Sequence, residues 1–418
     1  MSTNVEPPPY DNDTAKTVMD EKTATQPVVD NLDPSLLDPS ATASSSRAAS
    51  DKSALDSQNA SRAPSFVSAE AGETIKTPFT DPLPGCKPAS SADLTPEQET
   101  KYASLLSVVS TWDKIPTTSA RNSPTAPITD DERMWLTREC LLRYLRAVKW
   151  NPNEAPKRLL ATLIWRREYK LETFTPDYIS PENETGKQVI LGFDNDARPC
   201  LYLNPAKQNT QKSERQIQHL VFMLDRVIEM MGPGQETTAL LINFKNSSGS
   251  SNPSVGQGKQ TLTILQGHYP ERLGRALISE LPWYVTTFFK LISPFIDPVT
   301  KSKMKFNEPL SNHVPAQQLW SDYGGEAHFK YSHTDYWPAL NAICEEKRKA
   351  YKERWVQAGK KVGEYEAYLR GGDQMSLAQL IDHAGKMVDG TDAVGSKERV
   401  NEIDNAVAKG VENLKVAE

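Results

Sequence analysis

The residue types that most often carry chemistry form no recognised catalytic pattern in this chain. The nearest approach to a phosphate-binding loop is GQGK at Gly256 to Lys259, which lacks both the spacing and the Ser or Thr of a P-loop. The sequence contains no GxSxG elbow and no HExxH pair, and its six histidines show no metal-ligand spacing. We therefore expect a protein that is not an enzyme, binds no metal and carries no cofactor.

Composition excludes several further classes. The chain has 54 acidic and 48 basic residues, and its net charge of −6 disfavours bulk attraction to nucleic acid. Cys86, Cys140, Cys200 and Cys344 lie far apart and form no CxxC pair, as is typical of free thiols in a reducing compartment. The N-terminus lacks a secretory signal, and no window reaches the roughly 20 apolar residues that span a bilayer. We expect a cytoplasmic protein that visits membranes peripherally and has no nucleic-acid partner.

One segment, Trp283 to Ile296, is unusually apolar for a helix. At 100° per residue, eight apolar side chains fall in one arc of about 160°, with polar ones opposite. The apolar set is Tyr284, Val285, Phe288, Phe289, Leu291, Ile292, Phe295 and Ile296, and the polar set is Thr286, Thr287, Lys290 and Ser293. The segment is too short to span a bilayer, and Pro294 should fray its last turn. It fits either a lid over a lipid cavity or an ordinary core helix.

The first part of the chain predicts a tail followed by helices. Residues 1–94 are rich in Ser, Ala, Asp, Thr and Pro and should be a disordered tail. Order should begin with a helix at Thr95, and a second helix should open with the capping box of Thr129 and Glu132 and continue through Leu145. Asn151 should cap a third helix. These elements predict a helical domain over residues 95–172.

From about residue 187 the apolar period changes to that of strands. A hairpin over 189–203 is followed by a helix from Ser213, a buried strand over 239–244 and a helix around 260–266. A strand over 275–281, the apolar helix and a strand over 304–306 complete the pattern. Strands separated by helices imply an α/β unit over 173–331 with a largely parallel sheet. Residues 332–418 should form a helical, partly disordered extension that includes a helix over 335–354.

Five motifs in order along the chain resemble those of the CRAL-TRIO phosphatidylinositol transfer proteins. They are LLRYLRAVKW (141–150), RREY (166–169), YPERLGRALI (269–278), FFKLISPFIDPVTKSK (288–303) and YGGE (323–326). Within the family, the YPERLG and PFIDP segments are most similar to the fungal members linked to azole tolerance. The resemblance implies a helical CRAL-TRIO N-terminal domain, then a CRAL-TRIO lipid-binding domain whose hydrophobic cavity has a mixed, mainly parallel sheet as its floor. It also implies that 283–296 is a gate helix over that cavity.

The same resemblance implies the ligand-binding residues. By motif position, Glu271, Thr300 and Lys303 match the family's set that binds the phosphatidylinositol headgroup, and Lys149 matches a basic residue used with them. The residue types suit that role, because an ammonium pairs with a phosphodiester, a hydroxyl donates to it, and a carboxylate accepts from inositol hydroxyls. Without the family, Lys303 and Glu271 would pass for ordinary surface charges.

Several functions remain open at this stage. The leading hypothesis is a non-enzymatic exchanger of phosphatidylinositol, with that phospholipid as cargo and a transient membrane surface as partner. The endoplasmic reticulum, the cell periphery and lipid droplets are candidate membranes. The alternative is a carrier of sterol or another apolar lipid that presents its cargo to a partner such as a phosphatidylinositol kinase. A regulatory scaffold has only family-level precedent and no residue support.

Two departures from the family pattern affect the expected headgroups. The arginine that precedes the headgroup lysine in the family is Val148 here, so one phosphate contact is either missing or supplied elsewhere. Where members that also carry phosphatidylcholine place two hydroxyl residues on a strand, this chain has Thr238 and Leu240.

We predict weak or absent phosphatidylcholine binding. Leu240 cannot hydrogen-bond the choline phosphate, and a buried phosphate without its partner should lose on the order of a few kcal/mol of binding free energy. The measurement is vesicle-to-vesicle transfer of each phospholipid by the purified protein. Equal transfer of phosphatidylcholine and phosphatidylinositol would contradict the prediction.

Overall fold

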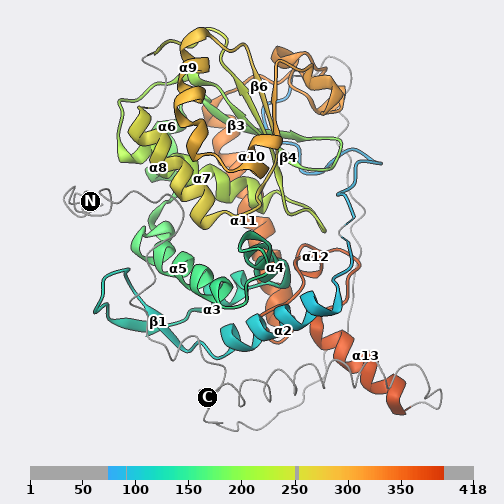
Figure 1. Cartoon of the computed structure of the whole chain (residues 1–418). Coiled ribbons are helices and arrows are strands. Elements are labelled where there is room, and N and C mark those ends of the chain that lie inside the picture. Colours follow the sequence, from blue (N-terminus) through green and yellow to red (C-terminus); the bar gives the residue numbers. More distant parts are fainter. Residues whose placement is uncertain (1–73, 91, 250–253, 390–418) are drawn as a thin grey trace, which may run out of the picture.

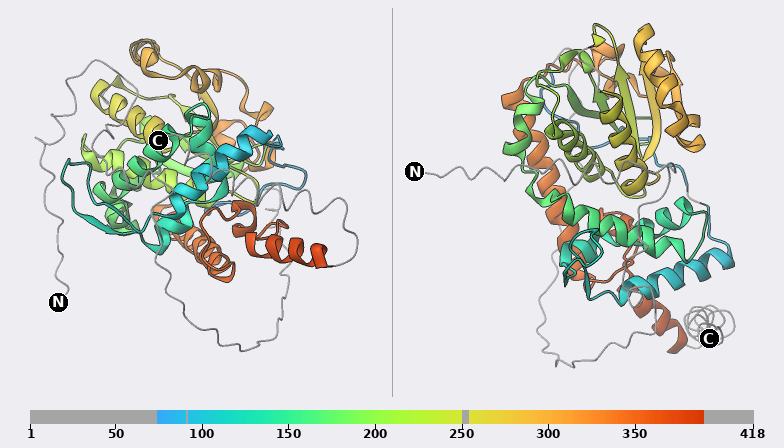
Figure 2. Two further views of the ribbon diagram at one scale, coloured as in Figure 1. Left: turned by 60° about the horizontal axis from the view of Figure 1, so that its bottom comes forward. Right: turned by 60° about the vertical axis from the view of Figure 1, so that its left-hand side comes forward.

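The computed structural model of the chain describes residues 74–90, 92–249 and 254–389 (Figure 1). One lobe contains the larger sheet and the other consists mainly of helices, and the long helix α11 runs from one lobe to the other (Figures 1 and 2). Helices around a mainly parallel mixed sheet confirm the α/β fold expected from the sequence.

The helical lobe has a core of its own. Its elements are α2 (Pro96–Ser110), a small hairpin of β1 (Lys114–Pro116) and β2 (Thr125–Pro127), α3 (Asp130–Trp135), α4 (Arg138–Ala147) and α5 (Glu154–Glu168). Leu141, Leu145 and Leu159 are among the fully buried side chains at its centre. The capping box of Thr129 and Glu132 is present as predicted.

Two boundaries in this lobe differ from the prediction. The single helix expected from Thr129 through Leu145 is wrong, because α3 ends at Trp135 and Thr137 caps a new helix, α4, by accepting a hydrogen bond from the Cys140 amide. Asn151 does not cap α5 directly; its side-chain oxygen accepts from the Asn153 amide, and Asn153 takes the cap position. An apolar period that continues across the junction hid the break between α3 and α4.

The larger sheet has the strand order β3-β4-β5-β6-β7. The strands are β3 (Gln188–Phe193), β4 (Pro199–Leu203), β5 (Thr238–Asn243), β6 (Leu273–Ser279) and β7 (Met304–Phe306). The hairpin of β3 and β4 is antiparallel, and the remaining pairs are parallel. The strand predicted over 275–281 is shifted, because it ends before Glu280, whose φ of 55° is left-handed.

Crossover helices connect the strands. They are α7 (Glu214–Glu229), α8 (Val255–His268), and α9 (Trp283–Ile292) followed by a short 3₁₀ turn (Ser293–Phe295) and α10 (Pro298–Ser302). The connection through α9 and α10 carries the chain from the C-terminal end of β6 to the N-terminal end of β7. The residues before and after this connection therefore lie at opposite ends of the strands, which are the two edges of the sheet where strands begin and end.

The end of α8 is fastened to the helical lobe by His268. Its ring stacks on Trp165 of α5 with centroids 4.1 Å apart, and its Nδ1 lies 3.1 Å from the Thr162 hydroxyl. Burial lowers the pKa of His268 to about 3, so the ring is neutral at physiological pH. Residues 269–273 leave this anchored point to enter β6.

Segments from both ends of the chain pack on these lobes. Ile75 forms a parallel bridge with Phe329, and the Gln318 amide donates to the Asp81 carbonyl at 2.8 Å. The disordered tail predicted over 1–94 is therefore wrong for the described residues from 74 onward, because Ile75 and Phe79 pack on the sheet core. Residues 1–73 lie outside the described part.

The C-terminal extension also packs against both lobes. Helix α6 (Pro176–Asn183) precedes the larger sheet in the chain. The extension comes after the sheet and contains α11 (His333–Gln357), α12 (Glu366–Leu369) and α13 (Leu377–Asp389). The Tyr336 hydroxyl donates to the Ile190 carbonyl at 3.0 Å, and Trp337 stacks on Phe222. Residues 390–418 of the predicted extension lie outside the described residues.

Gly192 should tolerate no side chain. It lies at the irregular register of β3 with a φ of 68°, and an added Cβ would overlap the Gln318 carbonyl oxygen. We predict that Gly192→Ala lowers the free energy of unfolding by about 3 kcal/mol, through left-handed strain and steric overlap. Urea denaturation measures the loss, with Gly232→Ala as control because its added Cβ meets nothing within 4 Å. Equal stability of the two variants would contradict this account of β3.

Candidate functional site

Glu271 occupies a tight turn between the anchored end of α8 and the start of β6. Its φ of 58° is left-handed, and the Arg272 amide donates back to the Tyr269 carbonyl. One carboxylate oxygen of Glu271 accepts from Arg146 Nε at 2.5 Å. The carboxylate is about one-third exposed, so part of it remains available to a ligand.

Lys303 lies at the same edge of the sheet, between α10 and the first residue of β7. Asp297 caps α10 by accepting from the Thr300 amide at 2.8 Å, and Lys303 follows as the C-cap residue. Lys303 Nζ donates to the Leu273 carbonyl at 2.6 Å. Burial lowers the pKa of Lys303, while the charges of Glu271 and Asp297 oppose that shift. An anionic ligand would stabilise this partly desolvated ammonium further.

The structure thus brings together most of the predicted headgroup set. Glu271 and Lys303 lie near enough to interact electrostatically, and Thr300 belongs to the turn that Lys303 ends, with the Lys303 amide donating to its carbonyl. Lys149 differs. Its side chain is exposed, and it makes no ion pair with any residue in the described part of the chain.

Arg146 and Glu236 were missed from the sequence. Arg146 contacts Glu271 through Nε and Glu236 through a terminal nitrogen at 3.2 Å, so it lies between two carboxylates at the edge of the site. Val148, which replaces the family's arginine, is partly buried against the helical core. The LLRYLRAVKW motif contained Arg146, but only the fold shows that it faces Glu271.

The strand position considered for choline phosphate offers little to a ligand. The Thr238 hydroxyl donates to the Pro199 carbonyl at 2.8 Å, so it is already engaged within the sheet. Leu240 is partly buried and packs against the sheet core. Neither side chain presents a free hydroxyl.

The apolar segment forms α9 as expected, and it packs across β5 and β6. Val285 is buried against Phe244 and Ile278. The Phe288 ring lies against α8 at Gly258, where an added Cβ would come within 2.8 Å of it. The Phe295 carbonyl accepts from the Gln266 side chain at 2.8 Å, which joins the last turn to α8.

The predicted inward arc of this segment is wrong at two positions. Leu291 is 55% exposed and Phe295 is 39% exposed, whereas Val285, Ile292 and Ile296 are buried. The α-helix ends at Ile292, and the 3₁₀ turn that contains Pro294 redirects the side chains after it. Leu291 lies at the edge of the predicted arc. When the centre of the arc packs against the protein, the Leu291 side chain therefore remains exposed to solvent.

A pocket of about 500 Å³ lies between α9, α10 and the edge strand β7. Its apolar lining comes from Leu281, Phe289, Ile296, Met304 and Phe306, and its polar lining from Thr286, Lys290, Ser293 and Lys301. Of the eight side chains assigned to the gate and cavity, Phe289 and Ile296 line this space. Three members of the polar arc line it as well, so the pocket lies to one side of the predicted inward face.

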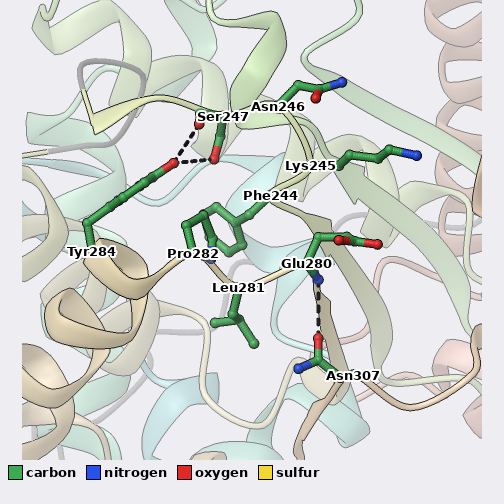
Figure 3. A pocket seen from close by; sticks show the side chains of 9 residues that line it. All are labelled: Phe244, Lys245, Asn246, Ser247, Glu280, Leu281, Pro282, Tyr284 and Asn307. Atoms are coloured by element: carbon green, nitrogen blue, oxygen red, sulfur yellow. Dashed lines mark hydrogen bonds between the residues drawn. The ribbon is translucent and has the colours of Figure 1, made fainter.

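The start of α9 is held at the opposite edge of the sheet, beside a pocket of about 750 Å³ (Figure 3). The Tyr284 hydroxyl donates to the Ser247 carbonyl at 2.6 Å and lies 2.9 Å from the Ser247 hydroxyl. The Glu280 amide donates to the Asn307 side chain at 3.2 Å. Glu280 and Asn307 both have left-handed φ values, so the chain turns sharply where it enters the helix and where it leaves β7.

The described residues contain no group of three or more His, Cys, Asp or Glu that could hold a metal, and no helix among them is long and apolar enough to cross a membrane. Cys140 and Arg146 have the spacing of a phosphatase loop, but both lie on α4. Burial raises the pKa of the Cys140 thiol to about 11, which disfavours the nucleophilic thiolate.

Comparisons with known proteins match both lobes. The protein-family model described as "CRAL/TRIO, N-terminal domain" matches residues 101–161, and the family model described as "CRAL/TRIO domain" matches residues 183–325. A CRAL-TRIO domain-containing protein of Schizosaccharomyces pombe is 52% identical over 302 residues, which are 72% of this chain and 30% of that protein. Phosphatidylinositol transfer protein PDR17 of Saccharomyces cerevisiae is 40% identical over 257 residues, which are 59% of this chain and 73% of that protein. The alignment thus spans less than a third of the Schizosaccharomyces relative.

Proposed function

The chain belongs to the CRAL-TRIO family, and we propose that it extracts, carries and exchanges single phosphatidylinositol molecules between membranes. It does so without catalysing a reaction, and the phospholipid is its cargo. The similarity to a phosphatidylinositol transfer protein over 73% of that protein's length supports this function. The motifs that carried the resemblance, from Leu141 to Glu326, fall largely within the two matched domains.

The observation that carries the proposal is the grouping of Glu271, Thr300 and Lys303 at one edge of the sheet. Lys303 is a partly desolvated cation suited to a phosphodiester, and Glu271 is a carboxylate suited to inositol hydroxyls. Both are fixed by the backbone, since Glu271 lies in a tight turn and Lys303 ends α10. A headgroup with a phosphate next to several hydroxyls matches this arrangement.

The acyl chains need apolar space near that edge. The pocket between α9 and β7 supplies part of it, and outward movement of α9 would enlarge it. Each methylene removed from water contributes about 0.8 kcal/mol, so two acyl chains provide ample affinity. The headgroup residues then decide which phospholipid is selected.

The outer face of the gate suits a membrane. Exposed large apolar side chains concentrate there, with Trp283 80% exposed, Leu291 55% and Val299 62%. Lys290 and Lys301, in the same stretch of the chain, are exposed as well. Apolar side chains together with cations favour the surface of a bilayer that contains anionic lipids, which would also solvate α9 as it opens.

A carrier of sterol or another apolar lipid, presenting its cargo to a phosphoinositide-metabolising partner, is the second candidate. The largely apolar lining of the pocket at Phe289, Met304 and Phe306 favours it, as does Leu240 on the sheet. Mass spectrometry of lipids extracted from the purified protein separates the candidates, because the first requires phosphatidylinositol and the second a neutral lipid.

Removing the headgroup cation should strongly weaken the transfer of phosphatidylinositol. We predict that Lys303→Ala lowers phosphatidylinositol transfer roughly tenfold or more, because it removes one charge-assisted hydrogen bond to the phosphate. Transfer between vesicles is the measurement, and circular dichroism checks the fold. Lys330→Ala, at an exposed lysine on the surface loop before α11, is the matched control. Unchanged transfer by the Lys303 variant would remove the basis for this site.

The membrane-facing surface can be tested separately. We predict that Trp283→Ala combined with Leu291→Ala weakens binding to vesicles of phosphatidylcholine and phosphatidylserine by roughly tenfold or more, since two large apolar side chains no longer enter the bilayer. Vesicle sedimentation measures the effect. Val356→Ala on α11, at an apolar side chain of similar exposure, should bind as the unchanged protein does. Equal binding by all three proteins would place the membrane contact elsewhere.

A further inference from the structure

A buried carboxylate from the C-terminal extension lies at the junction of the two lobes. Glu366 is the first residue of α12 and is almost completely buried. It lies beyond both matched domains, which end at residues 161 and 325. A buried charge is expensive unless it is paired, so its partners indicate what it does.

Those partners are arginines from three parts of the chain. Arg143 of α4 contacts Glu366 at 2.7 Å, while Arg272, just before β6, and Arg370, just after α12, lie 3.8 Å from it. The Thr137 hydroxyl also donates to Glu366, at 2.8 Å. Glu366 is therefore the common anion of three arginine side chains, two of which come from the domains that form the candidate site.

From this anion a continuous chain of contacts reaches the headgroup site. Arg143 contacts Glu236 at 2.7 Å, and the same oxygen of Glu236 contacts Arg146 at 3.2 Å. Arg146 then holds the Glu271 carboxylate at 2.5 Å. A second connection runs through the backbone, because Arg272 pairs with Glu366 and directly follows Glu271.

Glu366 offsets the charges of Arg143, Arg272 and Arg370, and it shares this region with the carboxylate of Glu139, which accepts from the Glu366 amide at 2.7 Å. Arg143 and Arg272 are both buried, and each is near enough to affect the other. Burial, the largest cause, and the charge of Arg143 together lower the pKa of Arg272 to about 10, while Glu366 opposes both effects. Without that anion, the two buried guanidinium groups would compete for Glu236. Arg146 would lose its share of that carboxylate, and Glu271 would lose its fixed orientation.

We propose that Glu366 is a positioning residue of the headgroup site, acting through Arg143, Glu236 and Arg146 on Glu271. The C-terminal extension is then part of the lipid-binding unit and sets the geometry of a carboxylate that it does not touch. This inference rests on the proposed binding of phosphatidylinositol.

The test compares variants of the full chain by the amount of phosphatidylinositol bound per folded monomer. Protein is incubated with vesicles of phosphatidylcholine and phosphatidylinositol, isolated by size exclusion and analysed by mass spectrometry. We expect Glu366→Gln to lower phosphatidylinositol loading three- to tenfold, as for coupled residues of one network. The control is Glu364→Gln. That carboxylate is also buried in the same segment, but it accepts from the Tyr365 and Leu377 amides.

A double variant separates positioning from a general loss of stability. Replacing Arg143 by Gln together with Glu366→Gln removes the surplus cation and leaves Glu236 to Arg146. Loading should then recover by at least half of the loss, which a merely structural role of Glu366 does not predict. Equal loading by the double and single variants would overturn the proposed route, and so would normal loading by Glu366→Gln.

The remaining outcomes also decide the matter. If Glu366→Gln does not fold, Glu236→Gln tests the same route at a more exposed carboxylate, and normal loading by that variant overturns the proposal. If the unchanged protein binds no phosphatidylinositol, the proposed function fails first, and the positioning role fails with it. Loss of loading by the Glu364 control as well would show that burial in this segment matters, not the link to the arginines.

Discussion

The stacking of His268 on Trp165 fixes the point from which the candidate site is built. It holds the end of α8 against α5, and the chain leaves that point through Glu271 and Arg272 to begin β6. The ring is neutral because it is buried, so it packs as an aromatic surface instead of as a charge. This contact therefore supports the turn at Glu271, which Arg146 reaches from the helical lobe. The site is thus a property of the contact between lobes, although most of its residues belong to the sheet lobe.

Local features of the fold could be read from the sequence, because they depend on neighbours in the chain. The capping box at Thr129, the hairpin of β3 and β4, and the apolar pattern of α9 all follow from spacings of a few residues. The break between α3 and α4 escaped, since apolar spacing continues through it while Thr137 starts a new cap. Phe295 escaped for a related reason, because helical periodicity does not extend into a 3₁₀ turn, whereas Leu291 lies in α9 at the edge of the predicted arc.

The electrostatic part of the site could not be read in the same way. Glu271, Thr300 and Lys303 came from motif positions, and the structure groups them. Arg146, Glu236 and Glu366 lie far apart in the sequence, and no spacing rule connects a charge near residue 143 with one at 366. Pairing over such separations is decided by how the lobes dock. The docking of the lobes also brings the guanidinium group of Arg146 to the site, although Val148 stands where the family motif has an arginine.

The packing of α9 against α8 depends on the absence of a side chain at Gly258. The Phe288 ring occupies the space where a Cβ would stand, so the two helices approach closely only because α8 is bare at that point. A methyl group there would meet the tip of the Phe288 ring at 2.8 Å, so the ring would have to move aside. The close contact of α8 with α9 at this point thus depends on the smallest residue type.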